Sequence, residues 1–392
     1  MNRDVVSILN KIAVAGANAD GSYTREPFSK EYFQAVDTVK GFMEELGMTV
    51  TVDAAGNAHG ILPGLNPALK HIIMGSHLDT VEQGGKYDGA YGVAGALAVL
   101  FQLKAANVQL NHTVEIYGFN GEERSTIGSK AVAGLIDKDD NYFAAQIKGY
   151  GHTVDEMLPC KRNFSDAKCF LELHIEQGER LDKEKLNIGI VSGIVAAARY
   201  KVVALGKSNH AGTTQMFRRH DALVGMCKLI LKGNELCRAL DPDMVFTVGT
   251  ISCEPGAKNV IPGRVECCFG MRQLDKTKMA ALIEAIKEEA EKISDCKFTI
   301  EPESFIPAAM CDKQIVADLE SVTKTAQLSS VVMPSGAWHD CNSFANLCPI
   351  GMIFVPSRDG LSHCKEEWTG DNDLQNGVKV LKGLVEKLDK EE

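Results

Sequence analysis

The stretch HIIMGSHLDTVEQGGKYDGAYGVAGALAVLFQLKAA, residues 71–106, joins a short apolar run, a glycine-rich loop and a longer apolar run. This pattern predicts a strand over 71–75 and a buried helix over 93–106. The loop between them carries His77, Asp79 and Asp88. A turn uses glycine and aspartate but has no need of histidine, whereas a metal site uses imidazole and carboxylate together. The loop therefore raises the question of a metal site at the end of a strand.

The surrounding sequence extends this strand, loop and helix into a larger α/β pattern. Residues 30–46 have helical spacing and end at Gly47, and residues 113–119 have the composition of a further strand. Strand, helix and strand in this order predict a sheet with parallel members. From about Ala198 the runs alternate and two amphipathic helices accompany them; after Ile306 the earlier pattern returns.

We therefore expect an α/β fold in two domains. The first, built from residues 1–197 and 310–392, is a catalytic domain with a mixed, mostly parallel sheet flanked by helices. The second, residues 198–309, is an inserted α+β sandwich that serves as a lid or dimerisation domain. A length of 392 residues suits two domains.

Composition restricts the function. The formal net charge of −10 argues against nucleic-acid binding, which needs a basic face. Twelve cysteines, none in a C-x-x-C pair, predict free thiols and a cytoplasmic protein. No stretch reaches the 18 or so apolar residues of a membrane span, so we expect no membrane partner.

Other segments offer further metal ligands just past strand-like runs. Two-metal hydrolases need about five imidazole and carboxylate ligands and a base for the water. The set is filled by His77, Asp88, Glu123, His174 and His363, with Glu122 as a base on the opposite side of its strand. Each alone has an ordinary interpretation: a core or surface histidine, a turn or helix cap at Asp88, or a solvated glutamate pair. Their combination favours a metal site, because ligands gather at the carboxyl ends of parallel strands.

Several motifs support a family resemblance. GSHLDT, YDGAYG, GEE, LELHIEQG, SNHAGTT, NVIPG and SHCKEEWT resemble, in this order, the M20-type metallopeptidase superfamily. They are most similar to its amidase branch, which includes N-carbamoyl-L-amino-acid hydrolases, β-ureidopropionases and allantoate amidohydrolases. LHIEQG together with HAGTT is more specific than the H-x-D motif, which all M20-type enzymes share. The resemblance runs from about Tyr23 to Val380.

The resemblance implies roles for the metal site. His77 and His174 would bind one divalent ion each beside the bridging Asp88, and Glu123 and His363 would complete the pair. Asp79 would fix the orientation of His77, and Glu122 would be the general base. Zinc is the first choice of metal, with manganese, cobalt or nickel as alternatives. The resemblance also implies a cis peptide after Asp88.

The resemblance further implies a homodimer with shared active sites. His210 would stabilise the developing oxyanion in the site of the partner subunit. Asn259 and Arg272 would grip the substrate carboxylate in that same site, and Gln177 would contact the carbamoyl end. His339 has a counterpart in the family, and for it we weigh an orienting role and a packing role equally.

The expected function is a dimetal amidohydrolase that cleaves the ureido C–N bond of an N-carbamoyl-L-amino acid, giving amino acid, CO₂ and ammonia. The alternatives are an allantoate amidohydrolase, an M20-type aminoacylase or aminopeptidase, and a non-catalytic homologue. Two departures from the family pattern affect substrate choice. The loop GEERSTIGSK is short and lacks a phenylalanine, and Trp338 stands where relatives often have glycine.

Overall fold

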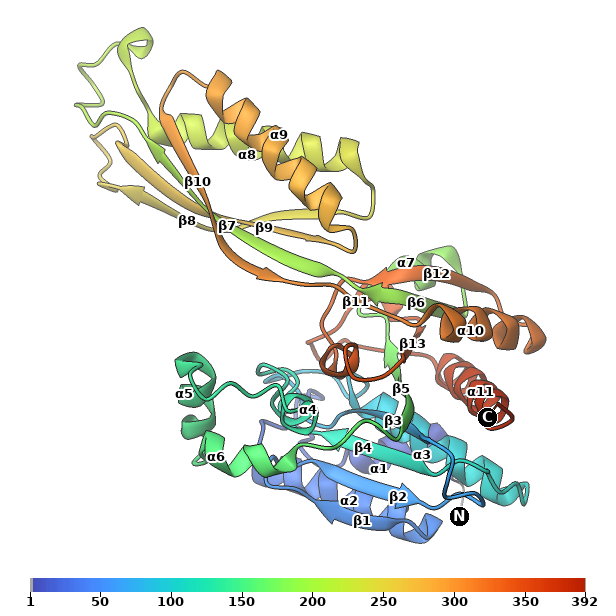
Figure 1. Cartoon of the computed structure of the whole chain (residues 1–392). Helices are drawn as coiled ribbons and strands as arrows, with labels where there is room; N and C mark the ends of the chain where they lie inside the picture. Colours follow the sequence, from blue (N-terminus) through green and yellow to red (C-terminus); the bar gives the residue numbers. More distant parts are fainter. Residues whose placement is uncertain (1–2, 392) are drawn as a thin grey trace. The chain divides into compact units, whose positions relative to one another are not determined.

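The computed structural model describes residues 3–391 and divides the chain into two compact units (Figure 1). Unit 1 is formed by two segments of the chain, the first ending at Ser192 and the second beginning at Met310. Unit 2 is the intervening segment, Gly193–Ala309.

Unit 1 is built on a nine-stranded sheet with the order β1-β2-β4-β3-β5-β13-β6-β11, in which β12 also pairs with β6. The strands are β1 Thr49–Val52, β2 Ala58–Leu62, β3 His71–His77, β4 Val114–Phe119, β5 Ala167–Ile175, β6 Ile188–Ile194, β11 Ala309–Met310, β12 Ser330–Ser335 and β13 Ile350–Val355. The central strands β4, β3, β5 and β13 are mutually parallel, whereas β1, β2 and β6 join by antiparallel pairs. The carboxyl ends of the four central strands therefore meet at one edge of the sheet.

Helices cover this sheet. They are α1 Val5–Ile12, α2 Lys30–Leu46, α3 Ala90–Ala105, α4 Ile127–Ala133, α5 Asn141–Gly149, α6 Val154–Met157, α7 Arg180–Glu184, α10 Lys313–Thr325 and α11 Asp371–Leu388. The side chains of α1, α2, α3 and α11 form one apolar core with the sheet, and α4, α5 and α6 share a smaller cluster. Helix α2 ends at Gly47 as expected, because that residue adopts φ 87°, a left-handed conformation that glycine tolerates best.

Helix α3 fixes the loop that precedes it. Thirteen of its sixteen residues are buried, so it is a central helix rather than an amphipathic one. A Cβ atom at Gly92 would lie 2.3 Å from the carbonyl oxygen of Leu173. A Cβ atom at Gly95 would lie 2.5 Å from the Leu173 side chain. These glycines let α3 pack directly on β5. The packing places Asp88, which immediately precedes the helix, beside the end of β5.

Unit 2 is a separate antiparallel sheet of four strands in the order β10-β7-β9-β8, with two helices. Its strands are β7 Ala196–Leu205, β8 Val245–Glu254, β9 Arg264–Gln273 and β10 Lys297–Ile306, and its helices are α8 Ala222–Leu240 and α9 Lys276–Lys292. Asp221 and Asp275 cap the two helices by accepting hydrogen bonds from backbone N–H groups of the first turns. The apolar faces of both helices pack on the sheet.

The observed architecture confirms the expected fold class: a mostly parallel sheet flanked by helices, with a separate α+β unit. None of the helices within residues 3–391 is long and apolar enough to cross a membrane.

At the other end of β4 from the carboxyl edge, the buried Glu115 holds together three cationic or polar side chains. Its oxygens lie 2.8 Å from Nε2 of His59, 2.6 Å from Nδ1 of His71 and 3.1 Å from Nε of Arg162. Burial alone would raise the pKa of Glu115, but the hydrogen bonds from His59, Arg162 and His71 outweigh it and hold the pKa well below the usual value.

We expect Glu115→Gln to lower the free energy of unfolding of unit 1 by about 2–4 kcal/mol at pH 7, because three partly buried partners lose the buried anion that binds them. Because the pKa of the carboxyl is lowered in the fold, its contribution is complete above the unfolded pKa of about 4.3 and fades as the pH falls. The difference in free energy of unfolding between wild type and Glu115→Gln, measured by urea denaturation, should therefore become smaller as the pH falls from 6 to 3.

Asp37→Asn is the control, since it breaks only an exposed ion pair with Lys40 at 3.9 Å and should change stability by less than about 0.5 kcal/mol. A gap between wild type and Glu115→Gln that stays constant over the pH range would contradict this account of Glu115.

Candidate metal centre

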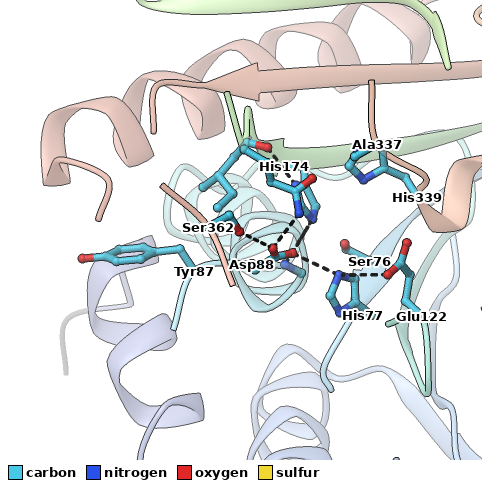
Figure 2. A network of polar contacts seen from close by, with 12 residues as sticks. Ser76, His77, Tyr87, Asp88, Glu122, His174, Ala337, His339 and Ser362 are labelled. Carbon is cyan, nitrogen blue, oxygen red and sulfur yellow. Dashed lines mark hydrogen bonds and ion pairs between the residues drawn. The ribbon is translucent and has the colours of Figure 1, made fainter. Parts of the chain in front are cut away.

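Asp88 lies at the centre of the cluster and is almost completely buried, with 3% of its surface exposed. Its Oδ1 atom lies 3.3 Å from Nε2 of His77 and 3.1 Å from Nε2 of His174 (Figure 2). Its Oδ2 atom lies 3.4 Å from Nε2 of His363, which in turn lies 3.2 Å from Oε1 of Glu123. The two oxygens of one carboxylate thus face two different sets of side chains.

Backbone carbonyls set the orientation of the two buried histidines. Nδ1 of His77 lies 3.0 Å from the carbonyl oxygen of Asp79, and Nδ1 of His174 lies 2.8 Å from that of Ile175. A carbonyl oxygen only accepts hydrogen bonds, so Nδ1 carries the hydrogen in each neutral ring. Both Nε2 atoms then present a lone pair toward Asp88, which is the arrangement a metal ligand needs.

Asp79 was expected to fix the orientation of His77. The structure gives that task to its backbone carbonyl, while the carboxylate lies 3.7 Å from the ring. The carboxylate instead accepts hydrogen bonds from the N–H groups of Gly121, Glu122 and Glu123, at 2.8, 3.1 and 3.2 Å. Asp79 thus connects the loop after β3 to the loop after β4, and so fixes the backbone that carries both glutamates.

Glu122 and Glu123 reach the cluster at different points. Oε2 of Glu122 lies 3.9 Å from Nε2 of His77, whereas Oε1 of Glu123 faces His363. Figure 2 shows the Glu122 carboxylate beside the His77 ring.

The charges of the cluster shift one another's pKa values. Burial alone would lower the pKa of His77, but the carboxylates of Asp88, Glu122 and Asp79 raise it well above its usual value. Burial, together with the charges of Asp340, Glu123 and Asp79, raises the pKa of Glu122 well above normal, although His77 opposes this. The buried carboxylates of the site therefore disfavour one another's charged forms, and a bound cation would relieve that repulsion.

Two orphaned oxygens show that a pair of cations fits this arrangement. Oδ1 of Asp88 and Oε1 of Glu123 are buried and, within residues 3–391, accept no hydrogen bond of suitable geometry. Buried carboxylate oxygens are rarely left in that condition. Donor atoms of His77, Asp88 and His174 lie within 4.8 Å of one another, and so do those of Asp88, Glu123 and His363. Imidazole and carboxylate donors of this kind suit zinc and related divalent ions.

This grouping differs in one respect from the expected division of ligands. His77 and His174 were assigned to separate ions, but both face the same oxygen of Asp88, so they form one ligand group. The cis peptide expected after Asp88 is likewise absent: within the described chain the cis bond is Glu254–Pro255. Gly89 adopts φ 62° instead, and the N–H of Ala90 bonds back to the Asp88 carbonyl.

Gln177 and His339 also contact this cluster. Nε2 of Gln177 donates a hydrogen bond of 2.7 Å to Oδ2 of Asp88. The buried ring of His339 packs edge-on against His174, with ring centroids 4.6 Å apart, and its Nε2 lies 2.9 Å from Oγ of Ser335. Burial and the neighbouring His174 hold the pKa of His339 well below its usual value. A neutral, packed His339 that steadies His174 agrees with both roles that the sequence left open.

The three remaining predicted residues lie in unit 2. His210 is exposed and pairs with Val260, and the N–H of Ala211 bonds to the carbonyl of Asn259, so His210 and Asn259 are neighbours. Arg272 lies near the carboxyl end of β9, where it pairs with Ala197 and Val245, whereas Asn259 precedes the amino end of that strand. The eight residues from Arg264 to Arg272 span about 25 Å of strand. Unit 2 therefore does not bring Arg272 together with the other two.

Sequence reasoning missed three polar residues around the centre: the buried Glu172 and Glu367 and the partly buried Ser362. Glu172 accepts hydrogen bonds from Ser76 and from the N–H of Cys341, both at 2.8 Å. Ser362 and Glu367 contact the Asp88 loop. A glutamate between two leucines of a buried strand was a readable signal for Glu172, whereas the other two lie in a loop whose composition predicts nothing.

Comparisons with known proteins agree with this geometry. Residues 73–387 match peptidase family M20/M25/M40. The chain is 34% identical over 393 residues to the N-carbamoyl-L-amino-acid amidohydrolase of Pseudomonas sp. (strain NS671), covering 95% of each protein. It is also 34% identical over 418 residues to the allantoate amidohydrolase of Bacillus subtilis (strain 168), covering 99% of this chain and 98% of the relative.

Among solved structures, the hydantoinase/carbamoylase family amidase of Burkholderia multivorans superposes with a TM-score of 0.85 at 27% identity, covering 97% of this chain and 96% of that one. These matches confirm the resemblance seen in the motifs. The chain belongs to peptidase family M20/M25/M40 and is a hydrolase of carbon–nitrogen bonds.

Proposed function

We propose that the protein is a dimetal amidohydrolase that cleaves the ureido C–N bond of an N-carbamoyl-L-amino acid, releasing amino acid, CO₂ and ammonia. The observation that carries this proposal is the two-sided environment of Asp88, with two histidines at Oδ1 and His363 at Oδ2. The names of the relatives support the ureido class of substrate.

In this proposal His77, His174 and Asp88 would hold the first ion, and Asp88, Glu123 and His363 would hold the second. Zinc is our first choice of metal, with manganese, cobalt and nickel as alternatives, because all four accept this donor set. When bound, the ions lower the pKa of a water molecule and polarise the substrate carbonyl.

Glu122 is the proposed general base. Its Oε2 takes a proton from the attacking water and later passes it to the leaving nitrogen of the substrate. Two observations support this role: Oε2 of Glu122 lies 3.9 Å from Nε2 of His77, in a group with Glu123 whose ligand atoms lie within 4.8 Å of one another, and burial raises the pKa of Glu122 well above normal. Asp79 contributes by fixing the backbone of the loop from Gly121 to Glu123.

The substrate would be held from several directions. Gln177, which lies against Asp88, contacts the carbamoyl end. His210 stabilises the negative charge on the carbonyl oxygen in the site of the partner subunit, and Asn259 beside it binds the carboxylate there. Arg272 lies toward the other end of β9, about 25 Å along the strand from Arg264, and its planar fork suits a carboxylate.

Unit 2 is accordingly the proposed dimerisation domain. Strand β8 forms one edge of its sheet, and seven of its ten residues are exposed. Val245 and Ile251 on β8, and Leu231 on α8, are exposed apolar residues at 50, 56 and 67%. An unpaired edge flanked by apolar side chains favours pairing with a second copy of the chain. A cytoplasmic location remains part of the proposal and rests on the cysteine composition.

An allantoate amidohydrolase is the second candidate, because an allantoate relative has the same identity as the carbamoyl one. The short loop after Glu123, which departs from the family pattern, is the segment we expect to influence this choice of substrate. In it, Arg124 pairs with Glu26 at 3.0 Å, and Ser125 and Thr126 both adopt positive φ angles. An aminoacylase or aminopeptidase ranks third.

A substrate panel tests the proposed function. With zinc or manganese, we expect N-carbamoyl-L-amino acids to be hydrolysed faster than allantoate, N-acetyl amino acids and dipeptides. A chelator should abolish turnover, and metal addition should restore it. Faster hydrolysis of allantoate would select the second candidate, and a preference for N-acetyl amino acids or dipeptides would select the third.

We expect Glu122→Gln to retain both metals while kcat falls roughly 10²–10⁴-fold, because only the proton carrier is removed. Glu123→Gln is the matched control and should lose metal. Metal content by elemental analysis and steady-state kinetics measure the two effects. Loss of metal in Glu122→Gln would show that the roles of the two glutamates are exchanged.

His210→Ala should mainly lower kcat, and a mixing experiment tests whether His210 acts across a dimer. When inactive His210→Ala and Glu122→Gln chains are unfolded and reassembled together, about one quarter of wild-type activity should return, because half of the dimers are mixed and each has one complete site. If His210 served the site of its own chain, every site in the mixture would lack one group and no activity would return.

A further inference from the structure

Glu367 is a buried carboxylate that none of the proposed roles uses. It lies four residues after His363 and has 4% of its surface exposed, whereas its neighbour Glu366 is exposed. Glutamate is almost never buried so completely without specific partners. Its partners therefore show what the side chain does.

All three hydrogen-bond partners of Glu367 belong to the Asp88 loop or contact Asp88. Oε1 accepts hydrogen bonds from the backbone N–H groups of Tyr87, at 2.9 Å, and of Asp88, at 3.1 Å. Oε2 lies 2.9 Å from Oγ of Ser362. That hydroxyl lies 2.7 Å from Oδ2 of Asp88, and Figure 2 shows the Ser362–Asp88 contact. Glu367 thus holds the backbone of Asp88, and the Ser362 hydroxyl, which has one hydrogen to donate, lies between the two carboxylates.

The loop is also packed directly against this side chain. A Cβ atom at Gly85 would lie 2.1 Å from Oε1 of Glu367, so no side chain fits there. Gly85 does not have a positive φ angle, so the conformation of the backbone does not demand glycine. Glycine is needed at this position because Glu367 occupies the space that a side chain would fill.

We propose that Glu367 is a positioning residue that sets the rotation of the Asp88 carboxylate, so that each oxygen faces its own group of metal ligands. This inference rests on the proposed dimetal function. A bridging carboxylate has to direct its two oxygens to two places at once, so a rotation about its last bond misaligns both. Two backbone contacts fix the start of the side chain, and the Ser362 hydroxyl fixes its end.

The test measures zinc affinity of the metal-depleted protein by competition with a chelator. Glu367→Ala should weaken zinc binding about 10–100-fold, the range seen when groups behind metal ligands are removed. Glu367→Gln should stay within about threefold of wild type. The amide oxygen of glutamine can accept from Tyr87 and Asp88, and its NH₂ group can donate to Ser362. Glu366→Ala is the matched control and should bind zinc as wild type does.

A second variant separates positioning from folding. Ser362→Ala leaves the backbone contacts of Glu367 in place and should weaken zinc binding about tenfold. The visible absorption of the cobalt-loaded protein should change in Glu367→Ala and Ser362→Ala but not in Glu367→Gln, because it reports ligand geometry. Thermal melting of the metal-depleted proteins shows which variants fold.

Wild-type affinity in a folded Glu367→Ala variant would overturn the proposal. If that variant does not fold, wild-type affinity in Ser362→Ala would overturn it. A Glu367→Gln variant as weak as Glu367→Ala would also overturn it, since charge rather than position would then matter. These readouts use no substrate, so failure of the ureido substrate panel with these affinities intact would affect only the proposed function.

Discussion

The structure depends on the placement of one buried carboxylate, Asp88, where the carboxyl ends of four parallel strands converge. Strands β3, β4, β5 and β13 run in the same direction, so the residues at and after their ends reach a common edge. Asp88 sits above that edge because α3 packs directly on β5 through Gly92 and Gly95. Chain segments almost 290 residues apart, from His77 to His363, are thereby brought to within hydrogen-bond range of one side chain. The convergence follows from topology, which is why the ligands need not be neighbours in sequence.

Concentrating negative charge in this way is costly unless every carboxylate has a task. Asp79, Glu172 and Glu367 are each satisfied by backbone N–H or hydroxyl donors, and each bond ties one ligand-bearing segment to another. Asp88 and Glu123 keep one unsatisfied oxygen each. The outer carboxylates therefore act as fixed acceptors that shape the loops, whereas the inner ones remain available to cations. This division explains why so many acidic side chains occupy so small a volume.

The sequence predicted the elements well where one strong local cause decides them. Helix α2 ends at Gly47 because the left-handed turn requires glycine, and β3 ends at the His77 motif because the apolar run ends there. It also predicted which residues meet, because strand ends and motif order both point to one cleft. The sequence could not predict which atom of a residue makes each contact. The Asp79 carbonyl, not its carboxylate, orients His77, and Glu367 was invisible because a glutamate in a polar loop looks solvated. Such details depend on backbone contacts between loops, which no local pattern encodes.

Within unit 2, Arg272 lies apart from His210 and Asn259, with which the resemblance grouped it. A paired β-strand is extended and has a fixed length per residue, so residues near the two ends of β9 stay far apart while the sheet is intact. His210 and Asn259 lie near one end, where Gly206 bonds to Gly263, and Arg272 lies near the other, where β7 begins. A single copy of unit 2 therefore presents two separate sets of polar groups. Two sets at opposite ends of one inserted domain are what an enzyme needs if each insert serves two sites.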